Sequence, residues 1–397
     1  MPRYFKVKTI IITVTLLLGM ILMVAYFKEP QSAFPTDYFT NTDLKYIYVN
    51  REKEENSITP DQESLPPKCE PNMDARKVWN FSSLSDQIQD FLYYRHCRNF
   101  PIILDLPYKC GRPNKPIDIF LLLVIKSPPK NYEQREVLRK TWAKERSHNG
   151  KKIRTIFITG TEGDGFEKKR LNKLLVLEHK QHRDILQWDF RESFFNLTLK
   201  QILFLEWMNR RCPHARFLLN GDDDVFAHTD NMVQYLQSLE DNNGTKHLFT
   251  GHVIKNASAN RKPNSKYFVP LQVYKERSYP AYCGGAGYLM SGYTASVIYE
   301  KSKSVEIIPI DDVYVGMCLA AAELKPNPHI GVRTLAWYIP SKMIDKYDPC
   351  FIKELLLIHK FPPAKLYIMW DEVHNPKLKC GVQLLNWWNP FILKSVV

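Results

Sequence analysis

Apolar residues along this chain fall into two patterns, short continuous runs and longer stretches with helical spacing. Continuous runs at Ile119–Ile125, Ile153–Ile158 and Phe217–Leu219 predict strands that are buried on both faces. Helical spacing predicts helices in four further segments: Asp86–Tyr94, Glu133–Trp142, Leu171–His179 and Thr198–Met208. Because strands alternate with helices, the pattern predicts an α/β domain with a mostly parallel central sheet.

A different pattern opens the chain. Residues 9–27 are uncharged and mostly apolar, and they are numerous enough for a helix to cross a bilayer. Arg3, Lys6 and Lys8 precede them, so the positive-inside rule predicts a cytosolic tail at residues 1–8, a transmembrane signal-anchor and a lumenal remainder. A cleaved signal peptide is the alternative, but it would have a shorter apolar core followed by a small-x-small cleavage site.

The segment after the anchor, residues 28–68, is polar and contains several prolines, which is typical of a stem or linker. A globular region is expected from Cys69 onward. The 44% of hydrophobic and 24% of charged residues are the balance of a folded protein. The net charge of +13 favours an anionic partner, but the basic residues are scattered, so nucleic acid is not an expected partner.

Eight cysteines are spread along the chain without a C-x-x-C pair. This spacing favours structural disulfides in an oxidising lumen over a metal cluster or a redox motif. Cys97 and Cys110 are the one local pair for which we predict a bond. Four N-x-S/T sequons are expected to carry N-linked glycans in a lumenal chain: Asn80, Asn196, Asn243 and Asn256.

The most informative polar residues follow the third predicted strand. Asp222, Asp223 and Asp224 repel one another, and such a cluster near a packed sheet needs a cation or basic groups to neutralise it. In α/β sheets ligands bind beyond the carboxyl ends of the strands, where these residues would lie. Carboxylates there suit Mn²⁺ or Mg²⁺ held jointly with a nucleotide diphosphate. A solvated acidic turn is the alternative.

Three more candidates lie downstream. Asp311 and Asp312 enter a predicted helix from an apolar segment, so one of them could be a partly desolvated general base, with a helix N-cap as the alternative. The small residues within Cys283–Tyr288 allow a ligand to approach the backbone closely, although a tight turn would need them too. His359 ends an apolar run and is a candidate third metal ligand, whereas a lone histidine there can also be structural.

Five segments, in this order along the chain, resemble motifs of the β-1,3-glycosyltransferases, glycosyltransferase family 31. They are Gln134–Trp142, Glu192–Lys200, Asp222–Phe226, Gly284–Gly287 and Ile310–Tyr314, and the resemblance extends from Phe91 to Cys380. Two stretches, FLYYRHCRNFP at Phe91–Pro101 and PAYCGGAGY at Pro280–Tyr288, are most similar to the β-1,3-N-acetylglucosaminyltransferase branch. Within that branch they resemble enzymes that extend core 1 O-glycans or poly-N-acetyllactosamine.

The resemblance implies a GT-A fold over residues 69–380 and an inverting transfer from UDP-N-acetylglucosamine to the 3-hydroxyl of a terminal β-galactose. It implies that Asp224 and His359 bind Mn²⁺ (or Mg²⁺), and that Asp312, ahead of Asp311, is the catalytic base. Donor-binding roles are implied for six residues: Arg135, Arg139, Asp222, Asp223, Gly284 and Gly285. With the anchor, it implies a lumenal enzyme of the Golgi membrane that acts on galactose-terminated glycans and forms homo- or hetero-oligomers with other glycosyltransferases.

The chain also departs from the family's pattern. Ala143 and Ala286 stand where glycine is usual, and the second adds a methyl group close to the expected sugar pocket. An apolar tail at residues 381–397 continues past the position where relatives tend to stop. We interpret that tail as an artefact of the gene model rather than an interaction segment.

Other functions remain as alternatives. A UDP-galactose-dependent β-1,3-galactosyltransferase would use the same machinery. A non-catalytic lumenal chaperone or lectin on this fold should have lost Asp222–Asp224, Asp312 or His359, all of which are present. A two-metal phosphodiesterase would need more histidine and aspartate ligands than the chain supplies.

Overall fold

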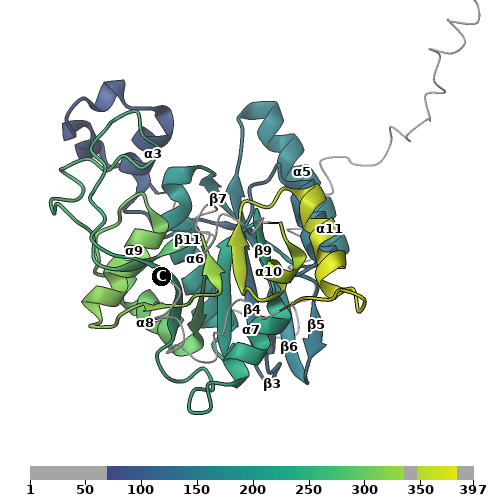
Figure 1. The fold of residues 1–397 in the computed structure, drawn as a ribbon. Coiled ribbons are helices and arrows are strands. Elements are labelled where there is room, and N and C mark those ends of the chain that lie inside the picture. The colour runs from purple at the N-terminus through teal and green to yellow at the C-terminus, as the bar shows by residue number, and fades with distance from the viewer. Residues whose placement is uncertain (1–68, 335–346, 382–397) are drawn as a thin grey trace, which may run out of the picture. The chain divides into compact units, whose positions relative to one another are not determined.

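The computed structural model describes residues 69–334 and 347–381, and the described chain is built around one large sheet (Figure 1). Edge to edge its strands are β1 (Ile102–Leu104), β7 (Ile185–Arg191), β6 (Lys151–Thr161), β4 (Leu121–Lys126), β8 (Phe217–Asp222), β11 (Tyr282–Ser291), β10 (Phe249–Ile254) and β12 (Asn327–Pro328), with β5 (Arg146–His148) paired to β6. The sheet thus combines strands from nearly the whole described range.

The centre of this sheet is parallel, whereas its flanks are mostly antiparallel, with β12 parallel to β10 at one edge. β7, β6, β4 and β8 run parallel to one another, whereas β11 is antiparallel to β8, and β1, β5 and β10 also pair antiparallel. The predicted mixture of helices around a central sheet is confirmed. The prediction of a mostly parallel sheet is wrong for the flanks, because β11 follows β10 through a loop that contains no crossover helix.

Helices cover both faces of the sheet (Figure 1). One cluster of buried residues contains side chains of α3 (Asp86–Tyr94), α6 (Leu197–Arg211), α8 (Gly292–Ser302) and α9 (Asp311–Ala321). The other contains side chains of α4 (Tyr132–Lys140), α5 (Gly165–His182), α7 (Thr229–Gln237), α10 (Pro349–Lys353) and α11 (Pro363–His374). All the predicted helices are present, and the one predicted over Leu171–His179 lies within the longer α5.

Smaller elements complete the described chain. Short 3-10 helices are η1 (Met73–Lys77), η2 (Phe81–Ser83) and η3 (Phe194–Asn196). A second sheet joins β13 (Val332–Arg333), β14 (Leu357–His359) and β9 (Val225–Ala227), and β2 (Gly111–Arg112) pairs with β3 (Lys115–Pro116).

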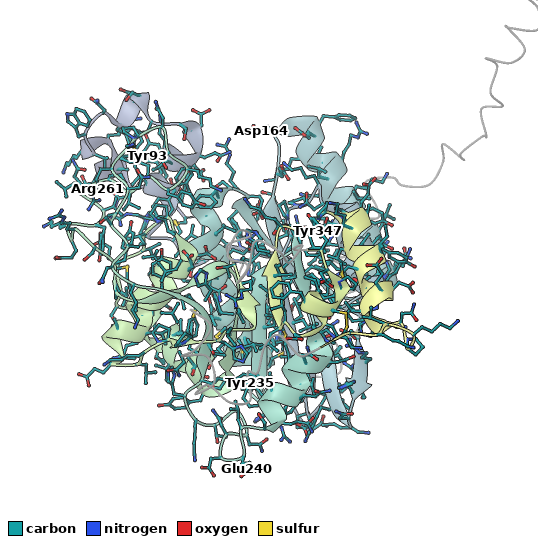
Figure 2. All side chains as sticks on the ribbon, in the orientation of Figure 1. Tyr93, Asp164, Tyr235, Glu240, Arg261 and Tyr347 are labelled. Atoms are coloured by element: carbon teal, nitrogen blue, oxygen red, sulfur yellow. A yellow bond between two sulfur atoms is a disulfide. The ribbon has the colours of Figure 1, made fainter. Side chains whose placement is uncertain are left out.

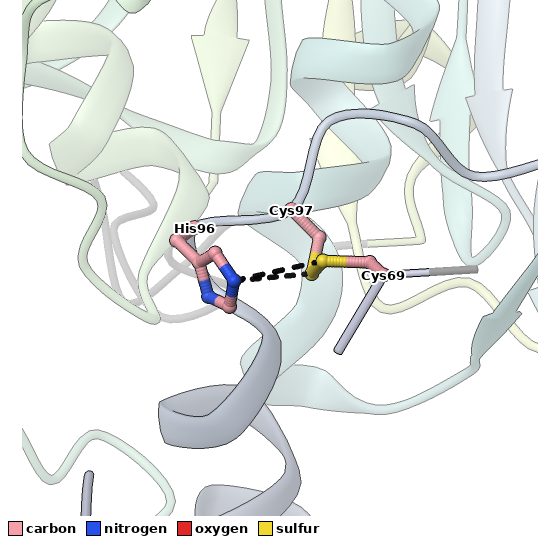
Figure 3. Close-up of side chains that lie close together, drawn as sticks. All are labelled: Cys69, His96 and Cys97. Atoms are coloured by element: carbon pink, nitrogen blue, oxygen red, sulfur yellow. Dashed lines mark hydrogen bonds between the residues drawn. A yellow bond between two sulfur atoms is a disulfide. The ribbon is translucent and has the colours of Figure 1, made fainter. Parts of the chain in front are cut away.

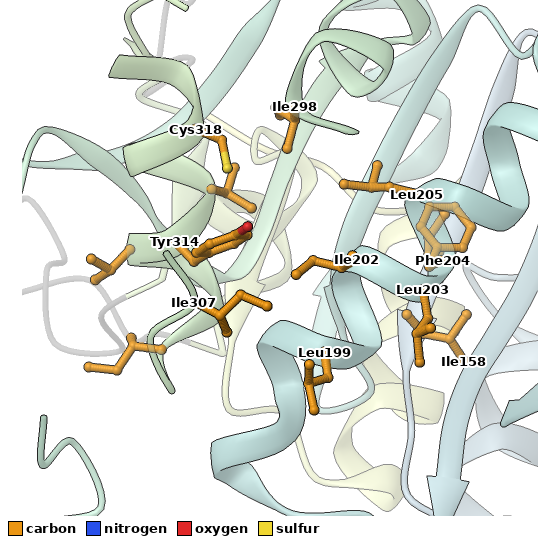
Figure 4. Packing of buried hydrophobic residues seen from close by; sticks show 14 of the residues in the cluster. Ile158, Leu199, Ile202, Leu203, Phe204, Leu205, Ile298, Ile307, Tyr314 and Cys318 are labelled. Carbon is orange, nitrogen blue, oxygen red and sulfur yellow. The ribbon is translucent and has the colours of Figure 1, made fainter. Parts of the chain in front are cut away.

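The strand β4 explains why the two clusters lie on opposite faces. Its Leu122 and Val124 belong to the first cluster, while the alternating Leu121, Leu123 and Ile125 belong to the second, and all five are fully buried. The prediction that this apolar run is a strand buried on both faces is therefore confirmed. Figure 4 shows part of the first cluster, with side chains of α6 between β6 and α9, and Figure 2 shows side chains on both faces of the sheet.

Disulfides join Cys69 to Cys97, Cys110 to Cys212 and Cys350 to Cys380, so the prediction of a Cys97–Cys110 bond is wrong. The segment before η1 runs back along α3, where the Asn72 amide donates to the Tyr93 carbonyl, and this brings Cys69 next to Cys97. His96 lies 3.6 Å from the Cys69 sulfur (Figure 3). The two sulfurs are bonded to each other and are not thiolates, so this group is not a metal site.

The predicted anchor at residues 9–27, the stem at 28–68 and nearly all of the tail at 381–397 lie outside the described residues. Within the described ranges, none of the helices combines the length and apolar character that a membrane crossing needs.

Candidate active site

One cavity of about 870 Å³ opens at the carboxyl ends of the parallel strands β4 and β8. Its lining includes the Asp222–Asp224 turn, Gly284–Ala286, the pair Asp311-Asp312 and His359. The structure therefore brings together segments that are far apart in the sequence. Ligand sites in α/β proteins are expected at this edge of the sheet.

A metal-compatible group lies at one end of the cavity. Single ligand atoms of Asp222, Asp224 and His359 all lie within 4.8 Å of one another. β14 pairs antiparallel with β9, so His359 lies opposite Val225 and next to Asp224, and its Nε2 is 3.2 Å from the Asp224 Oδ1. On the other side of the ring, Nδ1 lies 3.0 Å from the Thr334 carbonyl, which orients Nε2 toward the carboxylates.

This donor set fits a divalent cation. Two carboxylates with one oriented imidazole nitrogen suit Mn²⁺, and Mg²⁺ less well because it prefers oxygen ligands. Burial alone would raise the pKa of Asp224, but its hydrogen bond with His359 and the charges of His359 and Lys360 together outweigh burial and hold that pKa below the ordinary value. Burial alone would likewise lower the pKa of His359, but the hydrogen bond with Asp224, the charge of Asp224 and the contact with the Thr334 carbonyl together raise it.

Asp223, the middle residue of the turn, points elsewhere. Its Oδ2 accepts hydrogen bonds from the Ser127 hydroxyl at 2.7 Å and the Asn131 amide at 2.8 Å. The side chain is almost fully buried. Its Oδ2 therefore holds the turn against the loop after β4, while the residue also lines the cavity, so donor binding by Asp223 stays a prediction.

Asp311 and Asp312 begin α9, and their environments differ. Ile310 is the N-cap residue, so neither aspartate has the capping role considered above. The buried Asp311 forms an ion pair with Lys126 at 2.8 Å. The partly exposed Asp312 accepts hydrogen bonds from the amides of Gly285, at 2.9 Å, and Val313, at 2.8 Å.

Burial, and next the negative charge of Asp311, raise the pKa of Asp312 to about 7, against the opposing effect of Lys126. A carboxyl group with a pKa near neutrality, on the wall of a cavity, has the properties of a general base. Asp311 is the poorer candidate, because it is 5% exposed and its carboxylate is paired with Lys126.

Glycine lets the segment at residues 284–285 pack closely against Thr334 and Asp312. A Cβ atom on Gly285 would lie 3.2 Å from the Asp312 Oδ2, and one on Gly284 would lie 2.7 Å from the Thr334 Oγ1. The small-residue stretch therefore lets β11 approach the base and the residue that orients His359. Both glycines also line the cavity, as expected for a donor-binding position.

A sequence model of the Galactosyltransferase family matches residues 133–329, which include Asp222–Asp224 and Asp311-Asp312. The chain is 48% identical over 326 residues to the N-acetyllactosaminide β-1,3-N-acetylglucosaminyltransferase 3 of Homo sapiens, covering 82% of this chain and 86% of that protein. The chain belongs to this family. The acetylgalactosaminyl-O-glycosyl-glycoprotein β-1,3-N-acetylglucosaminyltransferase of Homo sapiens is 44% identical, with 81% and 83% covered. The UDP-GlcNAc:betaGal β-1,3-N-acetylglucosaminyltransferase 7 of Mus musculus is 41% identical, with 76% and 75% covered.

The roles that the family resemblance implied for Arg135 and Arg139 need correction. Arg135 is 1% exposed and forms two hydrogen bonds of 2.7 Å with the Glu178 carboxylate, and its other donors bind Ser127 and two proline carbonyls. Arg139 pairs with Asp184 at 2.8 Å. Both guanidinium groups are bound to groups of the protein itself. Arg135 therefore supports the Ser127–Asp223 contact instead of touching the donor.

Lys126 is a site residue that the sequence analysis missed. Its ammonium group is almost fully buried and lies 3.0 Å from the Asp222 Oδ1, 2.8 Å from the Asp311 Oδ2 and 3.1 Å from the Gly285 carbonyl. Burial by itself would lower the pKa of Lys126, but the two carboxylates outweigh burial and hold it well above its ordinary value. A lysine that ends a continuous apolar run was the available signal, because a charge buried there needs partners.

The four sequon asparagines differ in solvent exposure. Asn80, Asn243 and Asn256 are exposed. Asn196 is buried at the start of α6, and its side-chain nitrogen donates to Asp90 and to the Arg191 carbonyl, both at 2.9 Å. This burial disfavours a glycan on Asn196, whereas the exposure of the other three sequons agrees with the prediction for them.

Proposed function

We propose that this chain is an inverting β-1,3-N-acetylglucosaminyltransferase that moves N-acetylglucosamine from UDP-N-acetylglucosamine to the 3-hydroxyl of a terminal β-galactose. The observation that carries the proposal is the arrangement of one metal-compatible group, Asp222, Asp224 and His359, and one accessible base, Asp312, in a single cavity. The names of the relatives, all β-1,3-N-acetylglucosaminyltransferases, support the choice of sugar and linkage.

The base and the metal-compatible group act on different reactants: Asp312 on the acceptor, and the metal-compatible group on the donor. Asp312 accepts the proton of the acceptor hydroxyl as its oxygen forms a bond to C1 of the donor sugar. The bond from C1 to the diphosphate breaks on the opposite face, so the α-linked donor yields a β-linked product. A divalent cation held by Asp222, Asp224 and His359 would balance the charge of the departing UDP.

Lys126 positions both groups without entering the reaction. It contacts the Asp222 carboxylate on the metal side and the Gly285 carbonyl on the base side. The amide of Gly285 in turn holds the Asp312 Oδ2. Its buried positive charge also offsets part of the repulsion among the carboxyl groups of Asp222, Asp311 and Asp312.

The setting of the enzyme is part of the same proposal. The anchor at residues 9–27 would hold the chain in the Golgi membrane, with a GT-A catalytic domain at 69–380 in the lumen. The membrane anchor is supported by the charge pattern of the first residues. The described disulfides and the three exposed sequons are consistent with a lumenal domain.

The experiment is a turnover assay with purified lumenal domain, Mn²⁺, and UDP-N-acetylglucosamine, UDP-galactose or UDP-N-acetylgalactosamine, with and without a β-galactose-terminated acceptor. Transfer of N-acetylglucosamine, with a β-1,3 linkage shown by NMR, is the expected result. Preference for UDP-galactose would replace the proposal by a galactosyltransferase. Donor binding without transfer to any acceptor would favour a lectin or chaperone instead.

A further inference from the structure

A second cavity, of about 270 Å³, lies at the end of the parallel strands opposite to the candidate active site. One wall comes from residues 107–117, which lead into β4, and the other from residues 210–215, which lead into β8. Because β4 and β8 pair in parallel from Leu121 and Phe217 onward, both walls lie at the amino ends of these strands; β3, in the first wall, is labelled in Figure 1. The six residues of β4 separate this cavity from the site of Asp312 by roughly 20 Å.

Covalent and backbone contacts hold the two walls together. The disulfide between Cys110 and Cys212 joins them directly. Gly111 has a φ of +93°, and a Cβ atom there would lie 2.5 Å from the Lys115 carbonyl oxygen, so glycine allows the β2–β3 hairpin to close. The Ile117 amide then donates to the Cys110 carbonyl at 2.9 Å. The shape of this cavity is therefore largely set before any ligand binds.

The lining of this cavity is basic, and among the described residues it contains no carboxylate. Arg210 and Arg211 reach it from the end of α6, where a positive charge also complements the helix dipole. Their guanidinium nitrogens lie 3.6 Å from the carboxylates of Glu206 and Asp105, respectively. Both separations exceed the length of a hydrogen bond, so these ion pairs leave guanidinium donors available to a ligand.

Arg112, on the other wall, is not explained by a helix end. Its guanidinium carbon lies 5.5 Å from the ring centre of Tyr108, and in the described part of the chain no carboxylate forms an ion pair with it. Tyr108 lines the same cavity and is 62% exposed. Protein-binding surfaces are enriched in arginine and tyrosine and depleted in lysine and acidic residues, which is the composition of this lining.

We propose that this cavity binds an acidic segment of a partner protein, with a carboxylate side chain of the partner contacting Arg112 and the arginines at the end of α6. The volume is below the roughly 300–1,000 Å³ of small-molecule sites, so the cavity has room for a side chain rather than for a nucleotide or an oligosaccharide. Since the candidate active site opens at the other end of the strands, a partner bound here leaves that site accessible. The inference does not depend on the proposed transferase activity.

The probe is a fluorescein-labelled peptide in which glutamate alternates with proline, and the control peptide has glutamine in place of glutamate. Proline keeps both peptides extended, which lowers the ordering cost of binding. Binding to the purified full-length chain in a non-ionic detergent is measured by fluorescence anisotropy, without donor or acceptor sugars. The glutamate peptide is expected to bind at least about 5-fold more tightly than the glutamine peptide, the factor of one partly exposed ion pair of about 1 kcal/mol. The difference should fall as salt is added.

Three variants locate the effect. Arg112→Gln should weaken binding of the glutamate peptide about 5-fold without changing that of the glutamine peptide, and Arg112→Lys should keep most of the affinity. Arg170→Gln is the matched control, because Arg170 is exposed and lies over the Phe166 ring at 5.8 Å, but lines neither cavity. It should leave binding unchanged. The Tm of each variant should match that of the wild type, which separates loss of a contact from loss of folding.

The other outcomes overturn the inference in distinguishable ways. Equal affinity for the two peptides would show that the cavity does not recognise carboxylates. An equal loss of affinity in Arg112→Gln and Arg170→Gln would refute the location. Displacement of the probe by a sulfated oligosaccharide at a lower concentration than the unlabelled glutamate peptide would replace the protein partner by an anionic glycan.

Discussion

Replacing Asp312 by asparagine preserves the shape of the side chain but removes its ability to accept a proton. The wild-type pKa of about 7 arises from burial and from Asp311, opposed by Lys126. Because the base acts in its charged form, kcat/KM of the wild type should rise about tenfold per pH unit below pH 7 and level off above it. Asp312→Asn should lower kcat by roughly 10²–10⁴, remove this acid limb and leave UDP-sugar affinity nearly unchanged.

Two neighbouring variants make the test sharper. Asp311 raises the pKa of Asp312 and Lys126 lowers it. Asp311→Asn should therefore shift the acid limb of the pH–rate profile to lower pH, and Lys126→Met should shift it to higher pH. A change that only disturbed folding would lower the rate without moving the limb in opposite directions.

The pH dependence of the free energy of unfolding tests the pKa of Asp312 independently of activity. The pKa of Asp312 is higher in the folded protein than its ordinary value of 3.8, so the folded state binds this proton more tightly. Stability from this group is therefore present at low pH and is lost as the pH rises from about 4 through about 7. Asp312→Asn should be more stable than the wild type at pH 8, by roughly 1–3 kcal/mol after allowance for the partial exposure of the carboxyl, and equally stable near pH 4.

The assays are initial rates of sugar transfer from pH 5 to pH 9 and urea unfolding at pH 4 and pH 8, with all variants secreted as the lumenal domain. An Asp312→Asn enzyme with wild-type kcat, or with the acid limb still in place, would refute the assignment of the base. If Asp311→Asn were the inactive variant and Asp312→Asn the active one, the roles of the pair would be reversed.

Three further predictions follow from the fold and the site. Asp224→Ala should abolish transfer and weaken Mn²⁺-dependent UDP-sugar binding, and EDTA should do the same to the wild type; full activity in EDTA would contradict the metal assignment. Removal of residues 1–68 behind a cleavable signal peptide should yield a secreted, active enzyme, whereas a folded but inactive product would place part of the site in the stem. Asn196→Gln should leave the electrophoretic mobility of the secreted protein unchanged, because that side chain is buried, while Asn243→Gln should increase it.

Much of the architecture was predictable because it is encoded in local periodicity. The run Ile119–Ile125 has no polar face, and it became β4, whose side chains enter both apolar clusters. Asp86–Tyr94 has helical spacing and became α3 with the same bounds. The position of Asp222 was predictable as well, since an acidic turn directly after a buried strand must lie at an edge of the sheet.

Contacts between distant segments were not predictable in the same way. The antiparallel return of β11 depends on the loop from residue 255 to 281, whose sequence contains no period that specifies a direction. Cys110 bonds to Cys212, more than a hundred residues away, although Cys97 is nearer in the sequence. Motif resemblance implied donor binding by Arg135, but its buried ion pair with Glu178 gives it a supporting role inside the protein.

Gly285 shows why a motif can identify a site and still conceal its mechanism. From sequence, a glycine in a small-residue stretch indicates close approach of a ligand to the backbone. In the structure, the close approach is to Asp312: the Gly285 amide holds the carboxylate, its carbonyl accepts from Lys126, and a Cβ atom would press on the Oδ2. Since Lys126 also pairs with Asp222, the metal side and the base side form one hydrogen-bonded unit. Substitution of this glycine should therefore disturb both halves of the site together, which a purely ligand-contacting glycine would not do.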